Sequence, residues 1–445
     1  MAKPYKTPLL FQSKLLCFSL FYLFTTLFLA LYSTLSATKC IFRSSPFDPI
    51  QKPLFYYPST YGEHKYAIPT LRSSCIAPLY FSEYWSVFRE IYDILKNSSS
   101  PTSTLRYINT GSESFGGNLS TLDRISYFDR NDNEMKVPCG FMKELPISDY
   151  DRMSMESCRG VVVVSAIFGD HDKIRQPRGL GSKTLEVVCF FMFVDDHTFK
   201  VLSSHNLLKN DAEEHRLGAW RVVRVGGELP YESPSMNGVI PKHLVHRLFP
   251  NARYSIWLDA KIQLTVDPLL LIHSLIIKED VDMAISKHPY YVHTMEEAMA
   301  TARWKKWGDI GSLKMQMETY CEHGLQPWTH EKLPYPSDVP DTALIVRKHG
   351  VKSNLFSCLL FNELEAFNPR DQLAFAFVRD LMNPKLKMNM FEVEIFEQVV
   401  VEYRHNIKRG EENVASKLSV TKRARSNSPV RCQQYLLKMW GESHN

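Results

Sequence analysis

Long apolar runs that end on charged side chains constrain the fold of this sequence most. GVVVVSAIFGD (160–170) and LEVVCFFMFVDD (185–196) are continuous runs rich in β-branched and aromatic residues. Further strands are predicted at 220–225, 254–258, 281–286 and 343–349, and helices at 241–250, 295–307, 313–324, 355–367 and 370–382. Continuous apolar strands are typical of a sheet buried on both faces. Strands that alternate with helices indicate an α/β domain on a mostly parallel sheet flanked by helices.

The ends of these strands carry the candidate ligand-binding groups, because ligands of such sheets bind outside the carboxyl ends of the strands. The side chains there are Asp170, His171, Asp172, Asp195, Asp196, Asp259, Lys261, Lys287 and His288. The first strand is followed by GDHDKIRQP, which has neither the GxGxxG pattern nor a phosphate-binding P-loop. A dinucleotide-binding or NTPase function is therefore disfavoured.

The segment ARYSIWLDAKIQLTVDP (252–268) ends its strand on Asp259, and Lys261 follows two residues later. Many sugar-transfer enzymes have a second aspartate at the Lys261 position, and the pair holds a divalent metal. Strand side chains alternate, so Asp259 and Lys261 point to one side. We expect Asp259 to bind the donor sugar, its ribose or one Mn²⁺ or Mg²⁺ ion, and Lys261 to neutralise phosphate in place of a metal. The alternative is a turn-capping Asp259 with Lys261 as its solvated partner.

Two further groups of residues are candidate substrate ligands. Asp195 and Asp196 suit the base or ribose of a nucleotide, or else form a turn, and Asp170 is either a ligand or a loop cap. Asp371 is the candidate base or acceptor-orienting group, although helix capping is the ordinary role of an aspartate there. The remaining candidates for substrate binding are His288, Glu363, Arg370 and Gln372. The i, i+5 spacing of His288 and His293 is poor for zinc.

Residues 15–35 form an uncharged span of 21 residues that is long enough to cross a bilayer. Lysines precede the span, which predicts a type II anchor with a cytosolic tail (1–14) and a lumenal body. The alternative is a signal peptide cleaved near Ser36. Asn97 and Asn118 begin N-glycosylation triplets, which fits lumenal exposure.

The rest of the chain divides by composition into three parts. Residues 36–159 are expected to be a loop-rich stem and accessory region with one amphipathic helix at 81–96, and 160–406 the catalytic domain. The tail, 407–445, carries the whole net charge of +5, so the basic balance does not indicate nucleic-acid binding. We expect disulfides Cys40–Cys75 and Cys139–Cys158, whereas Cys189 and Cys358 lie in apolar runs and are expected to be buried thiols.

Five motifs together resemble one plant family. SIWLDAKIQLTVDP, RLFPNARYS, LPYPSDVPDTALIVRKH, SNLFSCLLFNE and RDQLAF are similar to the turgor-regulation-defect and mucilage-related family, whose domain was formerly of unknown function. The likeness covers about residues 136–405, and SATKCIFRSSPFDPIQ upstream is closer to the turgor branch. The resemblance implies a Golgi protein with a GT-A-like nucleotide-sugar fold. It implies hexosyltransferase activity in one branch and alkaline ceramidase activity in the other.

The residues themselves favour the transferase over the ceramidase. Multi-span ceramidases embed their metal ligands in the membrane, whereas this chain has one span, no Gly-x-Ser-x-Gly motif and no zinc-ligand spacing. We expect a nucleotide-sugar donor with a glycan or lipid acceptor. The alternatives are a ceramidase acting on ceramide, and a non-catalytic glycan- or lipid-binding protein.

Overall fold

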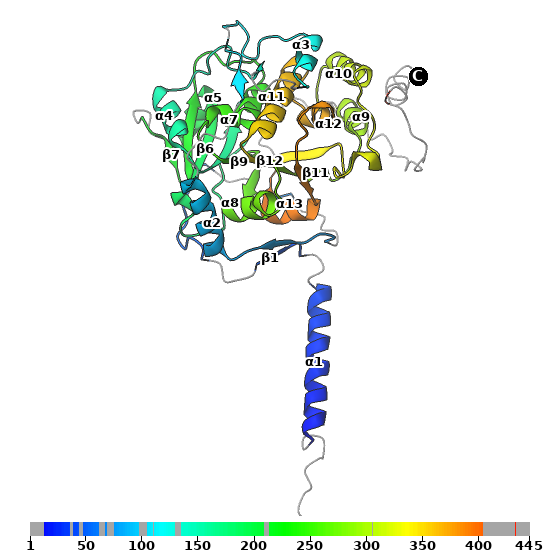
Figure 1. Cartoon of the computed structure of the whole chain (residues 1–445). Coiled ribbons are helices and arrows are strands. Elements are labelled where there is room, and N and C mark those ends of the chain that lie inside the picture. Colours follow the sequence, from blue (N-terminus) through cyan, green and yellow to red (C-terminus); the bar gives the residue numbers. More distant parts are fainter. Residues whose placement is uncertain are drawn as a thin grey trace, which may run out of the picture.

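The structure is a computed structural model that places one helix apart from a folded body (Figure 1). It describes residues 13–35, 39–43, 48–61, 67–68, 75–97, 105–109, 111–129, 135–208, 213–304, 306–403 and 432. Helix α1 (Lys14–Leu35) coincides with the predicted span. Its segment Lys14–Tyr32 has a mean hydropathy of 2.1 and is not buried against the body. The helix is long and apolar enough to cross a membrane.

An eight-stranded sheet forms the centre of the body. Its order is β13-β11-β12-β9-β5-β6-β8-β7. The strands are β5 (Val161–Ile167), β6 (Val188–Asp195), β7 (Arg216–Leu217), β8 (Trp220–Val225), β9 (Tyr254–Leu258), β11 (Met283–Lys287), β12 (Pro340–Lys348) and β13 (Met388–Phe391). Strands β9, β5, β6 and β8 are parallel, as are β11 and β13, while β12 is antiparallel to both of its neighbours. The predicted mostly parallel α/β sheet is confirmed.

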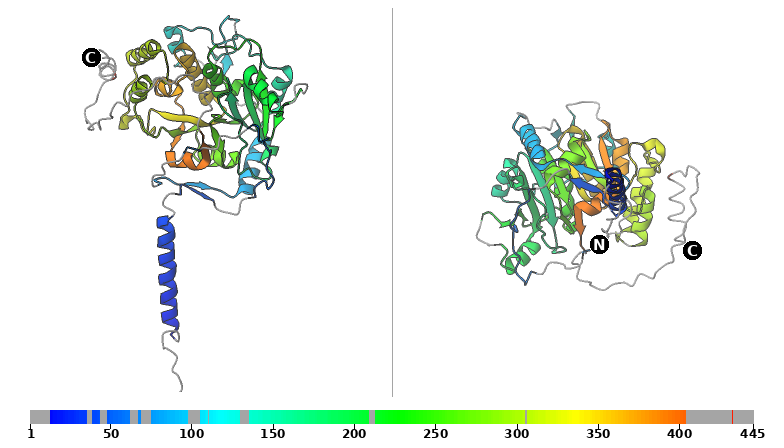
Figure 2. Two further views of the ribbon diagram at one scale, coloured as in Figure 1. Left: turned by 180° about the vertical axis from the view of Figure 1, so that it is seen from behind. Right: turned by 90° about the horizontal axis from the view of Figure 1, so that it is seen from below.

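Helices cover both faces of this sheet (Figures 1 and 2). Val162 and Val164 of β5 belong to one core, with helices α6 (Pro234–His243), α7 (Val245–Leu248), α9 (Thr294–Arg303), α10 (Ile310–Glu322), α11 (Val351–Ala366) and α12 (Asp371–Leu381). Val161 and Val163 belong to the other, with α2 (Tyr84–Lys96), α5 (Asp196–Ser204), α8 (Pro268–Ile272), the π-helical turn His273–Ile277 and α13 (Val393–Val399). The β-branched run at 161–164 is fully buried because alternate side chains enter the two cores.

The region upstream of the sheet is loop-rich but contributes to the body. Its elements are β1 (Ile41–Arg43), β2 (Leu79–Phe81), β3 (Arg106–Tyr107), α3 (Thr121–Ser126), β4 (Lys136–Val137) and α4 (Asp149–Ser157). The amphipathic helix expected at 81–96 is α2. Phe115, Val137 and Leu145 are buried in the core that contains α11, so this region packs as an accessory layer.

Several element boundaries differ from the predictions. The helix expected at 241–250 is two pieces, since α6 ends at His243 and α7 covers only Val245–Leu248. Strand β13 and the pair β10 (Ile262–Leu264) with β14 (Val400–Glu402) were not predicted, because three or four residues give no readable period. Single 3₁₀ turns lie at Thr184–Glu186 and His330–Lys332. The last apolar segment of the chain, 435–440, lies outside the described residues.

Four disulfides hold the body, and only one matches the prediction. Cys40–Cys75 is confirmed, whereas Cys139 bonds Cys358 and Cys158 bonds Cys189. The fourth is Cys321–Cys432. The prediction of Cys139–Cys158, and of free thiols at Cys189 and Cys358, is therefore wrong. The reason is that strand β6 and helix α11 bring partners from distant segments to Cα–Cα distances of 6.3 and 4.7 Å.

Candidate active site

Asp259 leaves the carboxyl end of β9 in a fixed orientation. The indole Nε1 of Trp257 donates a hydrogen bond to its Oδ1 at 2.7 Å. Its backbone N–H donates to the carbonyl of Ala343 at 2.8 Å. The Asp259 side chain is 29% exposed, so its carboxylate is held by the sheet yet open to a ligand. The strand predicted at 254–258 is confirmed residue for residue.

Lys242 of α6 completes this site and was not identified from the sequence. Its Nζ lies 3.4 Å from Asp259 Oδ1 and 2.8 Å from Asp371 Oδ2, and it donates to Thr342 Oγ1 at 3.1 Å. The lysine is buried. Burial lowers its pKa, but the two carboxylates outweigh burial and hold the pKa above its ordinary value. A lysine within an otherwise buried helix, in the run Pro241-Lys242-His243, was the signal available in the sequence.

Asp371 lies at the start of α12 and is enclosed by donors. Thr342 Oγ1 donates to its Oδ1 at 2.8 Å, and His243 Nε2 lies 3.3 Å from its Oδ2. Burial raises the pKa of Asp371, but Lys242 and His243 together outweigh burial and hold this pKa far below its usual range. Gln372 reaches the same Thr342 hydroxyl at 3.5 Å. A carboxylate this strongly stabilised is a weak proton acceptor and a firm anchor for Lys242.

Lys261 follows β9 and forms an ion pair with Glu402 of β14. The Lys261 Nζ–Glu402 Oε1 distance is 2.9 Å, and the side chains are 24% and 30% exposed. Burial lowers the pKa of Lys261, but the fields of Asp259, Glu402 and Asp341 outweigh burial and raise it. The pKa of Asp341 is raised by burial and partly lowered again by Lys261. Two lysines thus lie among four carboxylates at this edge.

The carboxylate cluster does not fit a hard divalent cation. Such ions take at least six oxygen ligands. Asp259 Oδ1 already accepts from an indole and an ammonium, and Lys261 Nζ occupies the position beside Glu402. Asp259 therefore gains no partner ligand from the expected second position.

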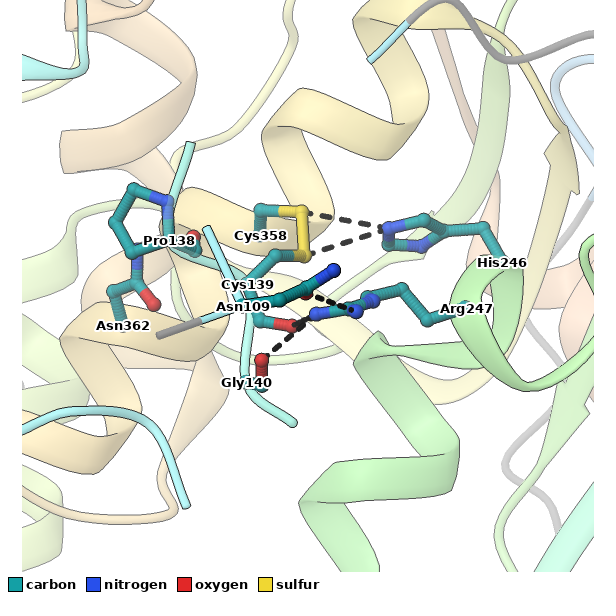
Figure 3. The surroundings of a disulfide bond; sticks show 8 residues. All are labelled: Asn109, Pro138, Cys139, Gly140, His246, Arg247, Cys358 and Asn362. Carbon is teal, nitrogen blue, oxygen red and sulfur yellow. Dashed lines mark hydrogen bonds between the residues drawn. A yellow bond between two sulfur atoms is a disulfide. The ribbon is translucent and has the colours of Figure 1, made fainter. Parts of the chain in front are cut away.

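Within the described part of the chain, one triple of Cys, His and carboxylate groups has ligand atoms within 4.8 Å of one another, and it is Cys139, His246 and Cys358. Figure 3 shows that its two sulfurs are joined in the disulfide, with His246 Nε2 at 3.5 and 3.4 Å from them. These sulfurs are not thiolate ligands. The group is a buried cross-link with a histidine packed against it.

The loop after β5 is tied to the start of α5. Gly169 N donates to Asp195 Oδ2 at 2.8 Å, while Asp195 Oδ1 caps α5 through Thr198 N at 2.8 Å. Asp170 has φ 54° and donates its N–H to Thr198 Oγ1 at 3.0 Å. Asp196 is half-exposed, and a hydrogen bond from Arg224 at 2.6 Å lowers its pKa. Asp195 thus shapes the loop, and Asp196 is the more accessible of the two.

A second polar group lies after β11, at the same edge of the sheet. His288 packs against Tyr291 with ring centroids 5.0 Å apart, and its Nε2 is 4.0 Å from Glu297 Oε2. Arg370 pairs with the other Glu297 oxygen at 2.5 Å. Burial lowers the pKa of His288 to about 4, and Lys261 is among the smaller contributions in the same direction. Tyr290 beside them is 76% exposed.

Glu363 is not brought to this edge. It is buried in α11, and its carboxylate accepts from Arg124 Nε of α3 at 2.9 Å. The ion pair fastens the accessory layer to α11. Asn97 and Asn118, the two glycosylation candidates, are both exposed.

Comparisons with known proteins place this geometry in a family. Residues 100–405 match the family model described as TOD1/MUCI70, glycosyltransferase-like domain. The chain is 62% identical to the Arabidopsis thaliana protein named alkaline ceramidase TOD1, over 98% of both chains. It is 39% identical to the Arabidopsis thaliana protein named probable hexosyltransferase MUCI70, over 62% of this chain and 48% of that one.

Two solved glycosyltransferases are more distant. Apo mouse xyloside xylosyltransferase 1 aligns with 52% of this chain and 85% of its own, at 8% identity and a TM-score of 0.29. The apo bifunctional glycosyltransferase WbbM aligns with 52% of this chain and 39% of its own, at 10% identity and a TM-score of 0.26. The extent of the family match, together with the mostly parallel sheet, shows that the chain belongs to the TOD1/MUCI70 family of glycosyltransferase-like domains.

Proposed function

We propose that this protein is a Golgi membrane glycosyltransferase with a lumenal catalytic domain and a nucleotide-sugar donor. One observation carries the proposal: two lysines, Lys242 and Lys261, lie close to Asp259 at the carboxyl end of β9. A diphosphate leaving group gains negative charge as the sugar bond breaks, and fixed cations at that point stabilise it. The family's glycosyltransferase-like domain and its hexosyltransferase-named member support the same chemistry.

The residues divide into donor and acceptor roles. Asp259, positioned by Trp257 and Lys242, binds hydroxyls of the donor sugar or ribose. Lys261 exchanges Glu402 for the diphosphate. Asp371 keeps Lys242 charged and oriented, which is the role its lowered pKa favours over that of a general base.

On the acceptor side, His288 and its neighbours extend the site. The exposed ring of Tyr290, with Tyr291 and His288 behind it, offers a flat aromatic surface for a sugar ring. Arg370 and Gln372 add hydrogen-bond donors beside it. Asp170, Asp195 and Asp196 shape the donor side near the loop after β5, where Asp196 is the accessible carboxylate.

Alkaline ceramidase activity is the alternative, because the relative named as a ceramidase is 62% identical over nearly the whole chain. The deciding experiment gives the purified full chain a panel of nucleotide sugars and, in parallel, ceramide, with and without chelator. We expect turnover of one nucleotide sugar that persists in chelator and falls about a hundredfold in Asp259→Asn. The matched control is Lys314→Ala, which removes an exposed ion pair on α10.

Lys261→Ala refines the outcome. Loss of a charged hydrogen bond costs about 1.5–3 kcal/mol, so binding of the nucleoside diphosphate weakens roughly ten- to a hundredfold while nucleoside binding changes little. Ceramide hydrolysis that is lost in Asp259→Asn, with no nucleotide sugar turned over, supports the ceramidase and overturns the transferase. Binding of a glycan or lipid without any turnover indicates a non-catalytic protein.

A further inference from the structure

Three large apolar side chains are exposed on the part of the body that follows the anchor helix. Ile76 is 79% exposed, Tyr80 of β2 61% and Trp85 of α2 38%. The ring of Phe42 in β1 stacks on Tyr80 with centroids 5.4 Å apart. We refer to Phe42, Ile76, Tyr80 and Trp85 as the anchor-side patch. Ile76, Tyr80 and Trp85 lie close together in the sequence, and neighbouring exposed apolar residues are typical of an interaction surface.

The chain itself holds this patch near the membrane. Helix α1 has 22 residues, about 33 Å at 1.5 Å per residue, which matches a hydrocarbon core of about 30 Å. Its end, Leu35, is five residues from Cys40, so the separation cannot exceed about 18 Å at 3.6 Å per residue. Cys40 is fully buried and bonded to Cys75. The first fixed point of the body therefore lies at the lipid headgroups or just above them.

The Cys40–Cys75 disulfide and the β1–β2 pairing keep the patch close to Cys40, and therefore close to the membrane. Cys40 O accepts from Leu79 N at 2.6 Å, and Phe42 is directly paired with Tyr80. Tyr80 thus lies one strand spacing from the segment that leaves the anchor. Figure 1 shows β1 and α2 on the side of the body that faces α1. The covalent and hydrogen-bonded link thus keeps Tyr80 within reach of the bilayer surface.

The side chains of the patch have the chemistry of a membrane interface. Trp and Tyr prefer the headgroup level because they combine an apolar ring with a polar end. On α2 the ring row continues from Trp85 to Phe88 at 6.1 Å and on to Tyr92 at 6.0 Å. Arg89 lies on the exposed side of the same helix, where its guanidinium suits lipid phosphate.

We propose that the anchor-side patch docks the body onto the headgroup and upper acyl region of the bilayer from which α1 emerges. Docking fixes the orientation of the body as well as its distance from the membrane. The candidate active site is then presented at a constant height above the lipid, which favours acceptors that lie in or on the membrane. This inference rests on α1 as an anchor and is independent of the reaction proposed above.

Photo-cross-linking of the full chain in phosphatidylcholine nanodiscs tests the docking. The photoreactive residue p-benzoylphenylalanine replaces Tyr80 or Trp85, and, as the matched control, Leu122 of α3, which is 77% exposed. Figure 1 places α3 at the end of the body away from α1. Replacement of Leu27 within α1 reports whether the anchor is inserted. We expect lipid adducts at positions 27, 80 and 85, with a yield at 80 and 85 severalfold above that at 122.

Two results overturn the proposal. Equal adduct yields at positions 80 and 122 show that the body does not lie on the bilayer. No adduct at position 27 shows that α1 is not the tether. A second measurement uses Tyr80→Ser with Trp85→Ser and, as control, Leu122→Ser. We expect faster amide exchange in β1 and β2 only in the patch variant, with an unchanged melting temperature in both. Unchanged exchange in the patch variant also contradicts docking.

Discussion

The ammonium of Lys242 lies 2.8 Å from the carboxylate of Asp371, and both side chains are buried at the carboxyl edge of the sheet. Neither charge is stable alone in that environment, because a buried ion without a partner loses hydration that nothing replaces. The pair also links α6 to α12. The Lys242 ammonium also contacts Asp259, so the positions of α6 and α12 determine where this ammonium lies in the candidate site.

Removal of Lys242 is expected to destabilise the body strongly. Lys242→Met leaves Asp371 buried without its main countercharge, which costs about 3–5 kcal/mol for a broken buried pair. Chemical unfolding of the full chain in nanodiscs measures the difference. The control, Lys314→Ala, breaks the half-exposed Lys314–Glu318 pair and is expected to change stability by less than about 1 kcal/mol. Similar losses in the two variants contradict a structural role for the Lys242–Asp371 pair.

Stability is expected to fall as the pH drops from about 6.5 to about 4. Burial lowers the pKa of His243 and His288 to about 4 and of His349 to about 3. The unfolded chain takes up these protons near pH 6.5, before the folded body can, so the stabilisation is complete above that pH and is lost on acidification. His288→Gln removes one such group. We expect a shallower pH dependence, by up to roughly 3 kcal/mol across this range. Parallel stability curves for parent and variant contradict the assignment.

The sheet was predictable because each central strand is a buried apolar run. Strand β9 was predicted with the correct bounds, since Tyr254–Leu258 is apolar and ends on a charge. Lys242 was missed because a lysine on a helix reads as solvent-facing, and its partners Asp259 and Asp371 are 17 and 129 positions away in the sequence. Only the folded sheet reveals that two carboxylates converge on it.

Other site residues show a second limit of sequence patterns. Asp195 sits where a nucleotide ligand is expected, and its carboxylate is used to cap α5 and hold Gly169. The sequence alone cannot separate these roles, because both place an aspartate at the end of a strand. Glu402 was missed for another reason: it lies on a three-residue strand whose partner, β10, is 138 residues upstream.

The disulfide between Cys139 and Cys358 is expected to be a main stabiliser of the body. It closes a segment of 219 residues, and loss of a native disulfide typically costs about 2–5 kcal/mol, more for longer segments. Cys139→Ser with Cys358→Ser should therefore lower the free energy of unfolding more than Cys40→Ser with Cys75→Ser, which opens 35 residues. Peptide mapping without reduction checks the pairing. A Cys139–Cys158 peptide would contradict the structure.

N-glycosylation is expected at two exposed asparagines if the body is lumenal. Asn97 lies at the end of α2, and Asn118 is exposed in a loop, where its φ is 50°. Endoglycosidase treatment of the protein extracted from membranes should increase its mobility on a gel, and Asn97→Gln with Asn118→Gln should abolish this change. Single variants should each remove part of it. A parent protein that is unaffected by the enzyme argues against a lumenal body.

The Lys261–Glu402 ion pair predicts the outcome of a double-mutant cycle. If Lys261 neutralises the diphosphate, its ammonium must leave Glu402, 2.9 Å away, to do so. Glu402→Gln removes that competition and the local negative charge, so binding of a nucleoside diphosphate should tighten severalfold. In the Lys261→Ala background the same change should have a much smaller effect, because the released ammonium is absent. Residues in direct contact typically show coupling of about 0.5–3 kcal/mol in such a cycle.

Calorimetric titration with a nucleoside diphosphate and with the bare nucleoside measures this coupling, since only the diphosphate should report it. Additive effects of the two substitutions would show that Lys261 is a structural partner of β14 and leave phosphate binding to Lys242.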